Sequence, residues 1–185
     1  MAVRDAVIQQ KSEYESKRKE RYVDRAMTVS GLESNLIKVI TGPRRAGKSF
    51  FAIHHFTGTA KIGYVNFDDE RLAGSTDYDE IIAAVNFVYD NPAHLLFDEI
   101  QNLPRGELLV NRLARAGFNL ILTGSNSHML SQELSTHLTG RYLQTTISPS
   151  LFQNIFPSRT SRSPAPANVN ISHDMRNWGA FLNCW

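Results

Sequence analysis

Short apolar segments alternate with segments of helical periodicity from residue 36 onward. Strand candidates are the apolar runs at residues 36–41, 61–67, 94–99, 119–124 and 141–147. Between them, residues 48–56, 77–90, 104–118 and 128–138 have the spacing or composition of helices. Strands that alternate with helices of about ten or more residues favour a parallel sheet with helices on both faces. The pattern therefore predicts an α/β fold with a five-stranded parallel sheet.

The two ends of the chain differ from this middle part. Residues 1–30 predict a charged helix with scattered apolar positions at Val3, Val7, Ile8, Tyr14 and Tyr22. Its basic cluster, Lys17, Arg18, Lys19 and Arg21, is interleaved with acidic residues, which is typical of a solvated helix face but also fits a nucleic-acid or protein contact. Residues 157–185 are rich in Ser, Pro and Asn and predict a disordered tail after a core at residues 31–156.

Composition narrows the class of protein. The 185 residues are 42% hydrophobic and 21% charged with a net charge of +2, which is ordinary for a globular protein and not typical of a dedicated nucleic-acid binder. Cys184 is the one cysteine, so an internal disulfide is excluded. The N-terminus has no secretory h-region, and no apolar run is long enough for a membrane helix. We therefore expect a cytoplasmic protein without a membrane partner.

A phosphate-binding motif follows the first predicted strand. The segment GPRRAGKS at residues 42–49 fits G-x-x-x-x-G-K-[ST] at every fixed position, with an apolar strand before it and a helix after it. This context predicts the P-loop of an NTPase that binds ATP. The residues expected to contact the nucleotide are Gly42, Pro43, Arg44, Arg45, Ala46, Gly47, Lys48, Ser49 and Phe50.

Each position of the motif has a physical role. Glycine at 42 and 47 permits backbone angles that turn successive N–H groups towards phosphate oxygens, and the helix N-terminus adds its positive dipole. Lys48 is expected to bridge the β- and γ-phosphates, and the Ser49 hydroxyl to bind Mg²⁺. Arg44 and Arg45 could contact phosphate, face a partner or be solvated; the sequence leaves these alternatives open.

The buried strand HLLFDE at residues 94–99 ends in two acidic residues and resembles a Walker B segment. Asp98 at the strand's carboxyl end is expected to hold Mg²⁺, usually through water. Glu99 is a candidate general base that polarises the attacking water. The sequence contains no N-K-x-D guanine-reading motif and no Arg-rich lid, which argues against a GTPase and a small-molecule kinase. Hydrolysis of ATP by water is favoured.

Polar residues at two further strand ends could complete a catalytic site. Ser125 and Asn126 follow the strand at 119–124 and could orient water or sense the γ-phosphate, or merely cap the next helix. Arg141 opens the last predicted strand and could supply charge to the γ-phosphate of its own or a neighbouring subunit, or be a surface arginine. Contact of Arg141 with the γ-phosphate of a neighbouring subunit would require a homo-oligomer.

These motifs together resemble a known family, the prokaryotic and often archaeal predicted ATPases of the AAA+ superfamily. The matching stretches are VITGPRRAGKS, YVNFDDERL, LLFDEIQNLP, LILTGSN and HLTGRYLQTTISPSLFQNIF. The resemblance implies strand order 5-1-4-3-2, Asp98 and Glu99 as Walker B, and the polar end of the fourth strand as sensor one. Gln101 and the pair Gly140–Arg141 are further marks of the family.

The resemblance also implies a lid and a second domain that the tail does not match, which suggests a truncation or an out-of-frame extension. We therefore consider two functions. The first is an ATPase that uses Mg²⁺ and drives a conformational change in an unidentified protein partner. The second is a nucleotide-binding switch, or a truncated remnant, that does not hydrolyse ATP. Nucleic-acid binding through the basic N-terminal helix is a third, weaker hypothesis.

Overall fold

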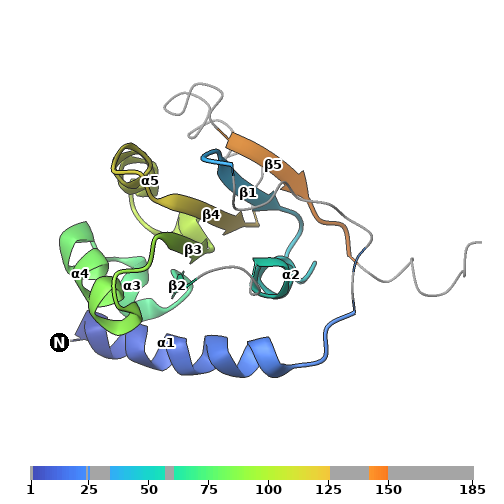
Figure 1. The fold of residues 1–185 in the computed structure, drawn as a ribbon, viewed down its shortest axis with the longest axis horizontal. Coiled ribbons are helices and arrows are strands. Elements are labelled where there is room, and N and C mark those ends of the chain that lie inside the picture. The colour runs from blue at the N-terminus through green and yellow to red at the C-terminus, as the bar shows by residue number, and fades with distance from the viewer. Residues whose placement is uncertain (1, 24, 26–33, 57–60, 126–141, 150–185) are drawn as a thin grey trace, which may run out of the picture.

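A single parallel sheet organises the protein. The computed structural model describes residues 2–23, 25, 34–56, 61–125 and 142–149. The strands are β1 (Ile37–Thr41), β2 (Ile62–Asn66), β3 (His94–Asp98), β4 (Asn119–Gly124) and β5 (Tyr142–Thr146). They lie in the order β2-β3-β4-β1-β5 and all pairs are parallel (Figure 1). Counted from the other edge, this is the order 5-1-4-3-2 that the family resemblance implies, so that prediction is confirmed.

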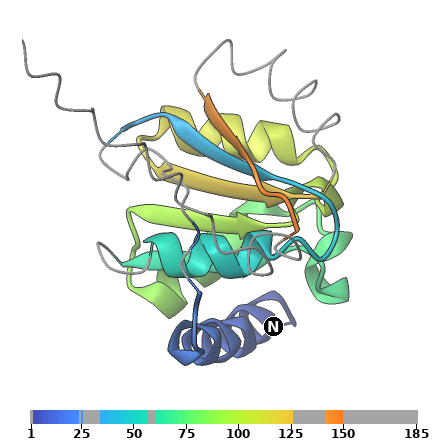
Figure 2. The same cartoon turned by 90° about the vertical axis from the view of Figure 1, so that its right-hand side faces the viewer.

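Helices cover both faces of the sheet. In the described part of the chain they are α1 (Ala2–Lys19), α2 (Lys48–Phe56), α3 (Glu70–Ala73), α4 (Tyr78–Tyr89), the 3-10 helix η1 (Ile100–Asn102) and α5 (Gly106–Arg115). Helix α2 lies on one face, whereas α4 and α5 lie on the other (Figures 1 and 2). The helix predicted at residues 128–138 lies outside the described residues. Because every strand runs in the same direction, all the carboxyl ends meet at one edge, where the connections to the helices begin.

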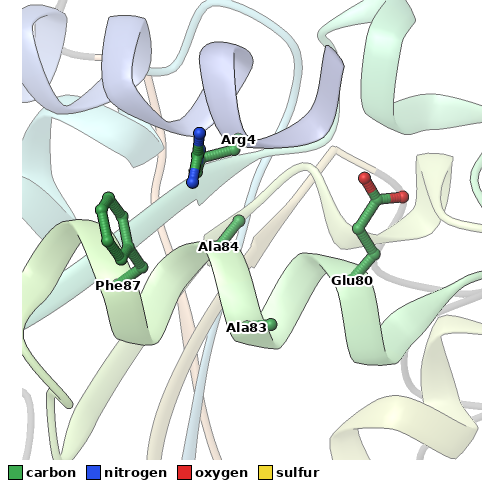
Figure 3. Close-up of a pocket in the computed structure, with 5 residues that line it drawn as sticks. All are labelled: Arg4, Glu80, Ala83, Ala84 and Phe87. Carbon is green, nitrogen blue, oxygen red and sulfur yellow. The ribbon is translucent and has the colours of Figure 1, made fainter. Parts of the chain in front are cut away.

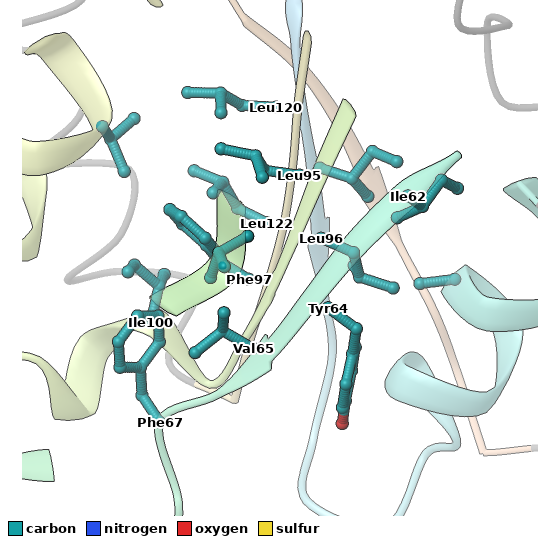
Figure 4. Packing of buried hydrophobic residues seen from close by; sticks show 14 of the residues in the cluster. Ile62, Tyr64, Val65, Phe67, Leu95, Leu96, Phe97, Ile100, Leu120 and Leu122 are labelled. Carbon is teal, nitrogen blue, oxygen red and sulfur yellow. The ribbon is translucent and has the colours of Figure 1, made fainter. Parts of the chain in front are cut away.

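The core forms where the two helical layers meet the central strands. Strands β3 and β4 are almost entirely buried, and their side chains pack on both faces of the sheet (Figure 4). Phe97 on β3 contacts Phe67 edge to face, with 5.4 Å between ring centroids. Near-continuous apolar runs, rather than alternating ones, are what a parallel sheet covered on both faces requires.

Local capping explains where the helices on the second face begin and end. Asp77 accepts a hydrogen bond from the Glu80 N–H at 2.9 Å and starts α4. Helix α5 begins at Gly106, two residues after the predicted start at Pro104, because residues 103–106 form a turn in which the Gly106 N–H donates to the Leu103 carbonyl at 3.0 Å. Gly117, with φ of +88°, follows the end of α5, as the sequence predicts.

Helix α1 is part of the core, which the sequence pattern did not indicate. Its buried residues, Val3, Ala6, Val7, Gln10 and Tyr14, form one stripe, and Tyr14 stacks on Tyr64 of β2 with centroids 5.3 Å apart. The helix lies along the β2 edge of the sheet (Figure 1). It ends at Lys19, earlier than the expected helix over residues 1–30. An edge strand with free backbone groups is thereby covered.

Gln10 joins α1 to this edge strand directly. Its side-chain amide donates to the Asn66 carbonyl at 3.0 Å and accepts from the Asn66 N–H at 2.9 Å. The same amide nitrogen donates to Asp69 Oδ2 at 3.2 Å. Gln10 therefore replaces a neighbouring strand at the end of β2.

The outer surface of α1 carries its charge. Of the basic cluster, Arg18, Lys19 and Arg21 are exposed and Lys17 is half-buried, which fits a solvated face and a contact surface equally. A cleft of about 400 Å³ lies between α1 and α4, where the Arg4 guanidinium stands 5.1 Å from the centroid of the exposed Phe87 ring (Figure 3). The lining of this cleft contains none of the P-loop residues. Within the described residues, the helices are too short or too polar to cross a bilayer.

Candidate nucleotide-binding site

The predicted P-loop connects a buried strand to a helix. Strand β1 ends at Thr41, and α2 begins at Lys48. Arg45 has φ of +64° and Gly47 has φ of +79°, and backbone of this kind turns successive amides to one side of a loop. The strand, loop and helix that the motif requires are therefore present, with the start of α2 at the carboxyl edge of the sheet.

Gly42 is required by a close approach of two backbone segments. Its φ is +151°, and a Cβ at this position would lie 2.2 Å from the Ile147 carbonyl oxygen. Ile147, which follows β5, also donates its N–H to the Thr41 carbonyl at 2.7 Å. The chain after β5 thus packs directly against the start of the P-loop. The motif alone explains Gly42 through its backbone angles, and this contact adds a steric reason.

Side chains from the start of α2 and the end of β3 meet at the P-loop. The Ser49 hydroxyl donates to Asp98 Oδ1 at 2.8 Å, which joins the start of α2 to the end of β3. Lys48 is 4% exposed, and its ammonium lies 3.3 Å from the Pro43 carbonyl and 3.4 Å from Glu99 Oε1. The structure therefore brings the P-loop together with the acidic pair, which lies about fifty residues further along the sequence.

Asp98 is buried and held by several hydroxyl donors. Besides Ser49, Tyr64 donates to Asp98 Oδ2 at 3.0 Å, and Thr123 donates to Oδ1. Burial, and after it the charge of Asp98, raises the pKa of Tyr64 well above its ordinary value. Sequence reasoning missed Tyr64, because nothing in an apolar strand shows which side chain will reach the neighbouring strand end.

Glu99 has a left-handed backbone, with φ of +51°, and its two carboxylate oxygens have different partners. Oε1 faces Lys48, whereas Oε2 accepts from the Gln101 amide and from the Ser125 N–H at 3.1 Å. Burial acts to raise the pKa of Glu99, but the Gln101 hydrogen bond and the Lys48 charge outweigh it, and the net pKa is lowered. Ser125 therefore contacts Glu99, and its hydroxyl accepts from Gln101 at 3.2 Å.

An aromatic and basic cluster borders the other side of the P-loop. Arg25 donates to the Ala46 carbonyl at 2.8 Å and to the Ser148 carbonyl at 3.1 Å. The ring of Tyr22 stacks on His54 of α2 with centroids 4.7 Å apart, and Phe50 lies 4.4 Å from His54. The sequence did not indicate that Tyr22 and Arg25 would reach the P-loop and α2, because these contacts join two distant segments. Phe50, predicted to contact nucleotide, is part of this cluster.

The remaining predicted residues are either exposed or undescribed. Pro43, Arg44 and Arg45 are exposed, so the alternatives of solvent, a partner or phosphate stay open for the two arginines. Asn126 and Arg141 lie outside the described residues, so their predicted roles stay predictions.

The oxygen atoms at Ser49 and Asp98 fit a magnesium ion. A hydroxyl and a carboxylate 2.8 Å apart are hard ligands, and Mg²⁺ is commonly held by one or two protein groups with water and phosphate completing its shell. Elsewhere in the described chain, His, Cys, Asp and Glu do not gather in groups of three or more suited to a metal. The donor set therefore suits a nucleotide-linked Mg²⁺ better than a metal caged by protein alone.

Solved structures with a similar fold include AMPPCP-bound DnaA from Aquifex aeolicus and the Aeropyrum pernix ORC1 protein in complex with DNA. The DnaA match has 17% identity and a TM-score of 0.44, and covers 63% of this chain and 42% of DnaA. The ORC1 match has 13% identity and a TM-score of 0.40, and covers 79% of this chain and 44% of ORC1.

Two curated relatives are similar in sequence. An uncharacterized protein of Methanocaldococcus jannaschii is 38% identical over 140 residues, which is 74% of this chain and 31% of that protein. An uncharacterized protein of Haemophilus influenzae is 29% identical over 161 residues, which is 80% of this chain and 40% of that protein. The chain thus spans well under half the length of the curated relatives it matches.

A family model described as an AAA domain matches residues 34–156. These residues contain the P-loop, the whole sheet and the acidic pair at the end of β3. The match covers about two thirds of the chain. The chain therefore belongs to the AAA domain family and is a P-loop protein of the AAA+ superfamily.

Proposed function

We propose that the chain binds ATP with Mg²⁺ at the P-loop and hydrolyses it to drive a conformational change in a protein partner. One observation carries this proposal: Lys48, Ser49, Asp98 and Glu99 converge at the carboxyl edge of the sheet. In an open α/β sheet this edge is where ligands bind. A lysine, a hydroxyl and two carboxylates in this arrangement suit a phosphate chain, a cation and a nucleophilic water.

The proposed chemistry assigns one task to each group. Lys48 and the amides at the start of α2 bind the negative charge of the phosphates. Ser49 and Asp98 would hold the Mg²⁺, which when bound offsets charge on the phosphate oxygens. Glu99 accepts a proton from water as the water oxygen attacks the γ-phosphorus. The bond from that phosphorus to the bridging oxygen breaks, and ADP and inorganic phosphate are the products.

Phosphate release by the purified chain tests this proposal. Wild-type protein should release phosphate from ATP in the presence of Mg²⁺, and Lys48→Ala should abolish the release by removing nucleotide binding. Glu99→Gln should retain binding and slow hydrolysis by roughly 100-fold or more, because the base acts in the chemical step. Hydrolysis by Glu99→Gln at the wild-type rate would show that the base is misassigned.

A second function is favoured by the contact between Lys48 and Glu99. The ammonium and the carboxylate lie 3.4 Å apart, so the two groups that hydrolysis requires neutralise each other. A protein that bound nucleotide without freeing Glu99 would act as a switch and not as an enzyme. Tight binding of ATP without phosphate release from the wild type would favour this alternative.

The partners and the cellular setting are further proposals. We propose an unidentified protein partner, a homo-oligomer in which Arg141 reaches a neighbouring subunit, and a cytoplasmic location. Nucleic-acid binding by the exposed basic end of α1 is a weaker proposal, and salt-dependent retention on DNA would be its signature. The division into a core at 31–156 and a tail at 157–185 likewise stays a prediction.

A further inference from the structure

The side chain of Gln101 connects three parts of the candidate site. Gln101 lies on η1, two residues after Glu99. Its amide nitrogen donates to Glu99 Oε2 and to the Ser125 hydroxyl, so both hydrogens are used. Its amide oxygen is buried and accepts no hydrogen bond from the residues that the structure describes. Every contact found for this amide therefore points to the site and none to the surrounding framework.

The carboxylate of Glu99 is held differently on its two sides. Oε2 is fixed by neutral donors, the Gln101 amide and the Ser125 N–H at the end of β4. Among the residues that the structure describes, the partner of Oε1 is the Lys48 ammonium at 3.4 Å, which is longer than an ordinary charge-assisted hydrogen bond. The hydrogen bonds of Oε2 therefore do not depend on Lys48, whereas Oε1 points to the P-loop.

Nucleotide binding would change only one of these two sides. Under the proposed function, phosphate takes Lys48 as its partner and competes with Glu99 for the ammonium. Oε1 then loses its cation, whereas the contacts of Oε2 involve no group that phosphate recruits. Without the Gln101 amide, the Ser125 N–H would be the one donor left to hold the carboxylate among the described residues.

We propose that Gln101 is a positioning residue that keeps the Glu99 carboxylate beside the phosphate site when Lys48 transfers its contact from Glu99 to the nucleotide. This inference rests on the proposed function. Gln101 acts through Glu99 and does not itself exchange a proton with the water. Its loss should therefore affect the chemical step more than nucleotide binding.

A substitution of Gln101 by methionine tests the inference, because methionine keeps the length of the side chain and removes the amide N–H donors and the amide oxygen. We expect kcat to fall roughly 10- to 100-fold, with KM and the affinity for a fluorescent ATP analogue changed by less than about 3-fold. Asn102→Ala is the matched control. Asn102 lies on the same turn, but its amide contacts Asp68 at 3.2 Å and not Glu99, so its kcat should stay near wild type.

A double variant separates positioning from a structural effect. If Gln101 acts only through Glu99, Gln101→Met should slow the Glu99→Gln protein by less than about 2-fold, although it slows the wild type strongly. An equal slowing in both backgrounds would overturn the inference. A fall in affinity that matches the fall in kcat, or a Gln101→Met protein as fast as wild type, would overturn it too.

A structure with a non-hydrolysable ATP analogue and Mg²⁺ tests the contact independently of turnover. We expect Lys48 on the phosphates and the Glu99 carboxylate still on the Gln101 amide. A Glu99 that has left Gln101, or that remains on Lys48, would contradict the inference. Binding without phosphate release from wild type would overturn the proposed hydrolysis alone, and this structure would then still decide the role of Gln101.

Discussion

Replacing Gln10 with leucine should destabilise the protein, although Gln10 lies on a helix outside the AAA domain match. The change removes both hydrogen bonds to the Asn66 backbone, at 3.0 and 2.9 Å, and the bond to Asp69 at 3.2 Å. Each such bond contributes about 1 kcal/mol, and the Asn66 N–H and carbonyl lose their partner at the sheet edge. The buried leucine offsets about 1 kcal/mol. The free energy of unfolding should therefore fall by about 2 kcal/mol.

Thermal denaturation followed by circular dichroism measures this loss. For a protein of this size, about 2 kcal/mol lowers the Tm by about 4–8 °C. Gln9→Leu is the matched control, because Gln9 is exposed at the preceding position of the same helix and contacts exposed Glu13 and Arg71. Its Tm should change by less than about 2 °C. Equal Tm values for the two variants would refute the conclusion that Gln10 joins α1 to the sheet.

Two further substitutions test the surroundings of the site. Tyr64→Phe removes a hydrogen bond to buried Asp98 and should lower the free energy of unfolding by about 1.5–3 kcal/mol at neutral pH. The folded-state pKa of Tyr64 is raised, so the stability that its hydroxyl contributes is present below about pH 10 and is lost as the pH rises further. Above about pH 10, the free energy of unfolding of the wild type should therefore fall more steeply than that of the variant, by up to about 1.4 kcal/mol per pH unit. Urea-denaturation profiles of the two proteins that run parallel from pH 9 to 11 would contradict this expectation. Gly42→Ala should lower the Tm and weaken binding of an ATP analogue, because its Cβ would lie 2.2 Å from the Ile147 carbonyl oxygen. Gly74→Ala, where an added Cβ meets no atom within 4 Å, should leave both measurements near wild type.

Much of the sheet follows from the sequence because a buried parallel strand has a simple signature. The apolar run at 119–124 coincides with β4, and the run at 36–41 differs from β1 by one residue. The strand order came from the family resemblance and not from the apolar pattern. An apolar run shows that a strand is buried but does not show which strand lies beside it.

The role of α1 shows what the pattern could not reveal. Its buried positions have the spacing of one helical stripe, but Gln10 stands in the middle of that stripe and charged residues surround it. A buried glutamine is understandable only once the Asn66 backbone groups are seen beside it. The signal that could have found the stripe is the helical spacing of Val3, Val7 and Tyr14, which the sequence interpretation treated as scattered.

The candidate site likewise contains residues that the sequence could predict and residues that it could not. The P-loop motif and the acidic pair are local in sequence, so Lys48, Ser49 and Glu99 could be proposed from their spacing. Tyr64 and Arg25 reach the site from distant segments through contacts that no local pattern encodes. Gln101 is close in sequence to Glu99, but their spacing alone does not show that the two side chains meet.

Binding of ATP at the P-loop is the central claim, and an equilibrium titration tests it most directly. Purified chain would be titrated with a fluorescent ATP analogue, with and without Mg²⁺, alongside Lys48→Ala and the matched surface variant Lys61→Ala, whose ammonium pairs with exposed Asp90. We predict saturable binding by wild type and Lys61→Ala that Mg²⁺ strengthens, and a loss of roughly 100-fold or more in affinity for Lys48→Ala. Equal affinities for wild type and Lys48→Ala, or no saturable binding by wild type, would contradict the account.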